Sequence, residues 1–256
     1  MQDRTSAQPA GTAGPPETVA ETVGDIVARD YRTAVVFERY GIDFCCGGSV
    51  TLADACRQSR ADPAALAAEL AAATSTPPQR PDQDPAAWTL TRLVDHITAT
   101  HHAYLRDNTG RIGAYARKID EVHGEQHPEL AGIVTVYSAM AAELTAHLQK
   151  EEETFFPAVR RAEKATREGE AVDPQDAETL GLLTDKLTRE HEAVGAALHQ
   201  IRDLSLGYAL PGDACATYTI TYQSLQRFET DLHRHVHLEN NLLFPRLNQM
   251  IGRQTP

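Results

Sequence analysis

The sequence predicts an all-α protein, an antiparallel four-helix bundle preceded by a small helical domain that carries adjacent cysteines. Four long helical patterns follow one another, at about residues 88–118, 128–165, 174–205 and 213–250. Alanine-rich runs between residues 64 and 74 favour helix as well. A segment near the end of the second pattern also recurs near the end of the fourth. Amphipathic helices joined by short connections are typical of an antiparallel bundle.

The order of segments along the chain predicts four parts. Residues 1–17 are rich in small and polar residues and lack a basic stretch followed by an apolar one, which indicates a disordered tail and not a signal peptide. Residues 18–74 form the small helical domain, and the proline-rich residues 75–86 form a linker. Residues 87–252 form the bundle.

Within the small domain, residues 18–40 are helix-like and residues 41–48 form a glycine-rich turn with the sequence Cys-Cys-Gly-Gly at its end. Thr51 and Asp54 are a capping signal for the helical stretch that follows. Pro63 is expected to divide that stretch in two.

Composition limits the classes of partner. The chain has 256 residues, enough for one sizeable core and a small extra domain, and its net charge of −12 argues against nucleic acid or an anionic membrane as a partner. No apolar run reaches the length of a membrane span. Four cysteines, two of them adjacent, do not resemble a secreted disulfide framework, so we expect a cytoplasmic protein.

The repeated segment has the pattern His-x-x-x-Glu followed by apolar residues and proline. It occurs at residues 147–157 and again at 235–245. Four residues make about one helical turn, so the imidazole and the carboxylate share one helix face, with Cβ atoms roughly 6 Å apart. The apolar residues that follow indicate that this face turns inward. A metal-chelating spacing therefore occurs twice.

A further histidine precedes each copy by a similar interval. Each of the four helices then contributes to one cluster, whose members are His102, His147, Glu151, His191, His235 and Glu239. Six side chains are too many for one tetrahedral zinc and suit a carboxylate-bridged pair of metals. His101 is the alternative to His102 if the first helix is rotated. Imidazole with carboxylate suits iron or manganese, while inherent affinity favours copper or zinc.

These motifs resemble the repair of iron centres (RIC) family of di-iron proteins. The resemblance rests on Asp-Phe-Cys-Cys-Gly-Gly at residues 43–48 and on the two His-x-x-x-Glu segments, and it covers about residues 18–250. It implies an ScdA-type N-terminal domain and a hemerythrin-like four-helix bundle. The family's ligand pattern matches the six residues above, and it implies two non-haem iron ions bridged by carboxylate and, when oxidised, by an oxo group.

The same resemblance implies a function in repairing iron–sulfur clusters damaged by nitrosative or oxidative stress, with damaged iron–sulfur proteins as partners and supply of iron as the mechanism. Two alternatives remain open: reduction of nitric oxide at the di-iron site, which would make the protein an enzyme, and hemerythrin-like sensing of O2 or NO. Oxygen carriage is disfavoured, because Gly195 and Arg106 stand where a carrier would have further histidines. A homodimer is left open.

The adjacent cysteines, Cys45 and Cys46, are candidates for a thiol role. They precede two glycines and a helix start, where backbone N–H groups lower a thiol pKa. They would act as iron donors or redox thiols, and the alternative is that they are two small packing residues. Glu143, one turn before His147, is either an outer carboxylate of the site or a surface residue. The remaining histidines are expected on solvated faces or in local hydrogen bonds: His96, His101, His123, His127, His199, His233 and His237.

Overall fold

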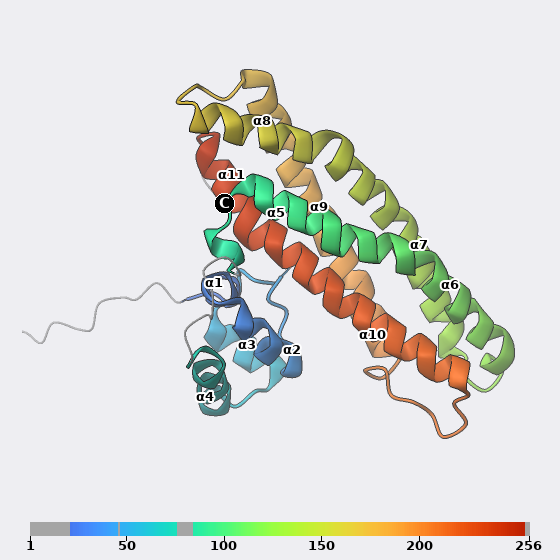
Figure 1. Ribbon diagram of the computed structural model, residues 1–256. Helices are drawn as coiled ribbons and strands as arrows, with labels where there is room; N and C mark the ends of the chain where they lie inside the picture. Colours follow the sequence, from blue (N-terminus) through green and yellow to red (C-terminus); the bar gives the residue numbers. More distant parts are fainter. Residues whose placement is uncertain (1–20, 46, 76–83, 254–256) are drawn as a thin grey trace, which may run out of the picture.

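The computed structural model describes residues 21–45, 47–75 and 84–253, and every regular element in these ranges is a helix (Figure 1). The all-α prediction is confirmed. The expected disordered tail, Cys46 and most of the expected linker lie outside the described residues. In the described ranges, no helix combines the length and the apolar composition that crossing a membrane requires.

The N-terminal unit is built from short helices. They are α1 (Val23–Arg29), the 3-10 turn η1 (Tyr31–Thr33), α2 (Ala34–Arg39), α3 (Leu52–Ser59) and α4 (Pro63–Thr74). The capping signal is confirmed, since the Thr51 hydroxyl accepts the backbone N–H of Asp54 at 3.2 Å. Pro63 begins α4 behind the capping side chain of Asp62 and so divides the helical stretch, as predicted.

The bundle consists of four rods, three of which are interrupted by one wider turn. After η3 (Pro85–Ala87), the first rod is α5 (Leu90–His96), η4 (Ile97–His102) and α6 (Ala103–His123). The second is α7 (Glu129–Lys150), η5 (Glu151–Phe155) and α8 (Phe156–Arg167). The third is α9 (Pro174–Leu204), and the fourth is α10 (Ala216–His237), η6 (Leu238–Leu243) and α11 (Phe244–Met250). The first rod runs five residues beyond the predicted end at 118.

The apolar residues of the bundle form two clusters, one on each side of the predicted metal ligands. In the first rod Leu93 belongs to one cluster and Leu105 to the other, while in the second rod the order is reversed, from Leu144 to Phe155. The third rod repeats the order of the first, and the fourth repeats that of the second. The reversal at each step shows that neighbouring rods are antiparallel, and Figure 1 shows them side by side.

The N-terminal unit packs against the bundle. One apolar cluster includes Val27 and Phe37 of the small unit together with Phe228 and Leu232 of α10. Phe44 is 1% exposed, and its ring meets the His233 and His237 rings of α10 edge-on. The small unit therefore adjoins the part of α10 that leads into η6.

The wider turns η4, η5 and η6 have π-helical geometry, in which a backbone N–H bonds to the carbonyl five residues earlier. The N–H of Phe156 donates to the carbonyl of Glu151, and that of Phe244 donates to the carbonyl of Glu239. Single π turns inside α-helices are rare and are often found at functional sites. Here they contain, or end at, His102, Glu151 and Glu239.

Candidate metal centre

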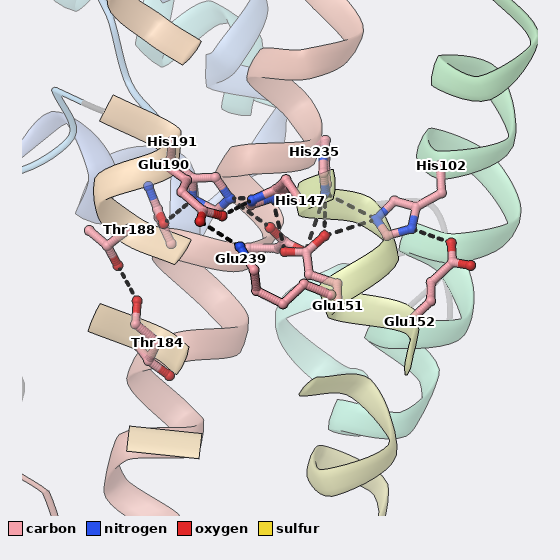
Figure 2. A network of polar contacts seen from close by, with 12 residues as sticks. His102, His147, Glu151, Glu152, Thr184, Thr188, Glu190, His191, His235 and Glu239 are labelled. Carbon is pink, nitrogen blue, oxygen red and sulfur yellow. Dashed lines mark hydrogen bonds and ion pairs between the residues drawn. The ribbon is translucent and has the colours of Figure 1, made fainter. Parts of the chain in front are cut away.

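The structure brings all six predicted ligand residues together in the middle of the bundle (Figure 2). They form two groups of four that share the two glutamates, and in each group the candidate ligand atoms lie within 4.8 Å of one another. We call the first group the His102–His235 half, and its two Nε2 atoms are 3.3 Å apart. The second is the His147–His191 half, where the Nε2 atoms are 3.2 Å apart.

Each shared glutamate directs one oxygen to each half. Oε2 of Glu151 lies 3.4 Å from Nε2 of His102, and Oε1 lies 3.1 Å from Nε2 of His147. Oε1 of Glu239 lies 3.2 Å from Nε2 of His235, and its Oε2 lies 3.1 Å from Nε2 of His191. Two carboxylates arranged in this way can each span a pair of ions.

The chemistry of this donor set fits cations. All six residues are at most 3% exposed, and none of the four carboxylate oxygens has a hydrogen-bond donor among the described residues. Buried carboxylates without donors are costly, and so are imidazole lone pairs that face one another. A cation between the donors of each half would compensate both costs, and the six residues therefore fit a pair of metal ions.

The two shared carboxyls titrate differently. Burial, and then the charge of Glu239, raises the pKa of Glu151 to about 7. Burial acts in the same direction on Glu239, but the facing imidazoles of His235 and His191 outweigh it and hold the pKa of Glu239 below its usual range. The two carboxyls therefore differ in the direction of their pKa shift, although they occupy equivalent positions of the repeat.

Local sequence explains how the glutamates reach the centre. His147 and Glu151 are one turn apart, as are His235 and Glu239, so each pair shares a face. Pro157 and Pro245 lack the N–H that an α-helix would use one turn earlier, which makes a wider turn before them less costly. The π turns at η5 and η6 follow from this motif. No proline accounts for η4.

Three of the four imidazoles are held from behind by a polar side chain. Nδ1 of His102 lies 2.6 Å from Oε1 of Glu152. Nδ1 of His147 lies 2.8 Å from Oε2 of Glu190, and Nδ1 of His191 lies 2.8 Å from Oδ1 of Asn240. With the proton on Nδ1, the Nε2 lone pair points into the centre, as metal ligation requires.

His235 is held differently. Its Nδ1 is buried and has no hydrogen-bond partner among the described residues. The ring of His101 stacks on it instead, with centroids 6.1 Å apart and planes inclined by 14°, while Nδ1 of His101 lies 3.0 Å from Asp231. His101 therefore belongs to neither half, and the structure places His102 in the centre, as first expected.

Sequence reasoning missed the outer carboxylates. Of the two alternatives for Glu143, an outer carboxylate of the site or a surface residue, the structure supports the second, because Glu143 is exposed. The signal for Glu152 and Asn240 was present, because each directly follows a shared glutamate. Glu190 directly precedes His191. The anionic form of Glu190 is favoured despite burial, because Lys150 and His147 lower its pKa.

Three of the other histidines do not lie on solvated faces, although one of them, His237, has the expected local hydrogen-bond contact, with Asn241 at 2.8 Å. His101, His233 and His237 are buried, since they lie on the side of their helices that packs against other elements. Burial lowers the pKa of His237 to about 3. His199 is exposed, and His96, His123 and His127 are half-buried.

Cys45 is a buried free cysteine at the edge of the N-terminal unit. Its Sγ lies 3.2 Å from Oδ1 of Asp43, which also accepts the Cys45 backbone N–H at 2.9 Å. Cys46 lies outside the described residues. The Cys45 backbone carbonyl accepts from Nδ2 of Asn240 at 3.4 Å, which places Cys45 beside the bundle, while its thiol role remains a prediction.

Comparison with known proteins gives a consistent result. The ScdA_N model, a domain of unknown function (DUF542), matches residues 19–74, and the hemerythrin HHE cation binding domain matches residues 93–247. The chain is 33% identical over 228 residues to the iron-sulfur cluster repair protein YtfE of Yersinia pestis (strain Pestoides F), covering 88% of this chain and 96% of the relative. The protein of the same name from Yersinia pseudotuberculosis (serotype O:1b, strain IP 31758) is 32% identical over the same shares.

Proposed function

Because this chain belongs to the hemerythrin HHE cation binding family and also carries an ScdA_N domain, we propose that it is a di-iron protein that repairs damaged iron–sulfur clusters, the function given in the name of its YtfE relatives. The observation that carries the proposal is the pair of four-residue groups with two shared carboxylates. Nitrosative or oxidative stress would damage the clusters, and the iron–sulfur proteins of the cytoplasm that carry them would be the partners.

The chain's own residues would bind and orient the metals. His102 and His235 would hold one ion, His147 and His191 would hold the other, and Glu151 and Glu239 would each contribute an oxygen to both. Glu152 and Glu190 would keep the proton on Nδ1 of His102 and His147, so that the Nε2 lone pair of each ring stays free to bind a metal ion. The apolar clusters on either side exclude bulk water from the centre.

We further propose that iron is the cargo supplied to the damaged cluster. A cavity of about 470 Å³ lies between the N-terminal unit and the third and fourth rods, lined by Cys45, Thr188, Glu192 and Asn240 among others. This cavity supports a route on the side of the cysteines, where Cys45 and Cys46 would assist delivery or docking. The oxo bridge expected from the sequence stays a prediction, which the absorption spectrum of the oxidised protein tests.

Reduction of nitric oxide is the second candidate. Each half offers two imidazoles and one oxygen from each shared glutamate, which is fewer than the six ligands of octahedral iron and leaves positions open. Two ferrous ions would supply two electrons, which with two protons convert two NO molecules to N2O and water. Sensing of O2 or NO would use the same open positions without turnover.

The deciding experiment measures iron content and then iron transfer. We expect two irons per chain after reconstitution, and activity recovered by an iron–sulfur protein whose damaged cluster has lost iron but kept its sulfide, when it is mixed with the loaded chain. N2O formed catalytically without iron transfer would favour the second candidate. One zinc per chain, with no iron uptake, would contradict both.

A further inference from the structure

The two asparagines after Glu239 contact the loop that carries the cysteines. We call the described residues 43–45 and 47–49 the Cys loop. Nδ2 of Asn241 donates to the carbonyl oxygen of Phe44 at 3.2 Å, and Nδ2 of Asn240 donates to that of Cys45 at 3.4 Å. Two successive amides of η6 therefore hold two successive carbonyls of the N-terminal unit.

The amide of Asn240 has one possible orientation. Nε2 of His191 faces the centre, so Nδ1 carries the proton and donates to Oδ1 of Asn240 at 2.8 Å. With Oδ1 committed to His191, Nδ2 points to the other side, where the Cys45 carbonyl lies. A single side chain thus joins the backbone of the Cys loop to a candidate metal ligand.

Among the residues that the structure describes, the other half of the centre has no such link. Glu152 and Glu153 occupy the equivalent positions after Glu151 in the first copy of the repeat. Carboxylates accept hydrogen bonds and cannot donate them to a carbonyl. Glu152 holds His102 and pairs with Arg106 of the first rod, with no contact to the Cys loop. The two copies of the repeat therefore differ at the position that contacts the Cys loop: the second copy has Asn240 there, and the first has Glu152.

The backbone of the Cys loop packs tightly against the side chain of Asn241. A Cβ added to Gly48 of the Cys loop would lie 3.3 Å from Oδ1 of Asn241, and one added to Gly24 of the adjoining α1 would lie 2.9 Å from the same atom. Both distances are shorter than ordinary van der Waals contact. A displacement of the loop toward η6 must consequently move Asn241, and one away from η6 must break the hydrogen bonds that Asn240 and Asn241 donate to it.

We propose that Asn240 is a positioning residue that couples docking of the Cys loop to metal binding in the His147–His191 half alone. A docked loop holds Asn240 and through it His191, so metal in that half and loop docking stabilise each other, as linkage between two sites requires. The two metals are consequently unequal, and the one beside the loop is released when the loop undocks. This inference rests on the proposed di-iron centre.

The test uses the full chain, with ferrous iron as the probe. Hydrogen exchange is followed at residues 44–50 with and without iron, and iron loss to an excess of chelator is timed. In the unaltered chain we expect iron to slow exchange of the Cys loop and the two irons to leave in two phases. Failure to bind two irons would refute the di-iron proposal itself, whereas two irons with no effect on loop exchange would refute only the coupling.

Three variants locate the coupling. Asn240→Ala should speed loss of one iron by about tenfold, within the range known for residues behind metal ligands, and should abolish the effect of iron on loop exchange. Asn240→Asp keeps an acceptor for His191 but lacks the donor to Cys45, so iron should stay and the effect on the loop should vanish.

Asn241→Ala is the matched control, because it removes the bond to Phe44 and leaves His191 supported. Exchange of the loop should rise overall, but iron should still slow it. Equal acceleration of both irons in Asn240→Ala, or loss of the iron effect in Asn241→Ala, would overturn the proposal.

Discussion

At the residue scale, the four buried oxygens of Glu151 and Glu239 account for the character of the centre. Each carboxylate faces both halves, whereas each histidine faces one. A shared ligand and a terminal ligand should therefore differ in how many ions depend on them.

Glu151→Ala or Glu239→Ala should abolish binding of both irons, because each substitution removes one donor from each half and leaves the opposing imidazoles uncompensated. Iron per chain, measured after reconstitution and desalting, gives the answer. His127→Ala is the control, since His127 bonds Asp213 away from the centre. Comparable loss of iron in the control would show that the ligand assignment is wrong.

Glu152→Leu should weaken iron binding about 10-fold or more, because Nδ1 of His102 would lose its acceptor and the ring its orientation. Competition with a chelator measures the affinity. The adjacent Glu153→Leu is matched in chemistry but exposed, and it should leave the affinity unchanged.

At the element scale, helix ends in this bundle are tied to neighbouring helices. The carboxylate of Glu163 in α8 accepts the backbone N–H groups of Leu90 at 2.6 Å and Thr91 at 2.8 Å, at the start of α5. Burial opposes the charged form, but these bonds outweigh it and lower the pKa of Glu163. The first rod is thereby fixed to the second near the ligand-bearing turns.

The lowered pKa predicts how stability depends on pH. The contribution of Glu163 is fully present above its unfolded pKa of about 4.3 and is lost as the pH falls through the lower folded value. Glu163→Gln should therefore cost about 1 kcal/mol at neutral pH, typical of a weakened helix cap, and the difference from the unaltered chain should shrink in acid. Urea unfolding at several pH values checks this. Glu168→Gln, at an exposed position of the same segment, should show neither effect.

At the scale of the whole molecule, the N-terminal unit shares a core with the bundle, and Phe44 lies at the junction. Phe44→Ala should lower the free energy of unfolding by about 3 kcal/mol, since it leaves a cavity against His233 and His237. Thermal and urea unfolding measure the loss. Val35→Ala in the same unit should change little, because Val35 is 48% exposed; an equal loss there would contradict the buried junction.

Cys45→Ser combined with Cys46→Ser should leave iron content and spectrum intact, because the bundle supplies all six candidate ligands and Cys45 contacts Asn240 through its carbonyl and not its thiol. Cluster repair should nevertheless fall if the thiols assist delivery. Repair assays on the loaded double variant separate the two properties. Full repair would assign the cysteines a structural or regulatory role.

The sequence by itself determined the all-α class and five of the six clustered residues, and it left the sixth as either His102 or His101. Both follow from local relations: helical periodicity, the one-turn spacing of His147 with Glu151 and of His235 with Glu239, and the duplication of that spacing. Such relations hold within a single helix, so they do not depend on how the helices are placed.

Only the tertiary structure decided which residues stand behind the ligands and which half adjoins the Cys loop. Glu190 reaches His147 from another rod, Asn240 reaches both His191 and Cys45, and His101 turns inward onto His235. The rotation of each rod about its axis sets these contacts. The π turn η4 changes that rotation in the first rod, and no proline in the sequence predicts it. The helical periodicity of the sequence does not define how one rod is rotated relative to the next, because the packing of all four rods and the N-terminal unit together determines that rotation.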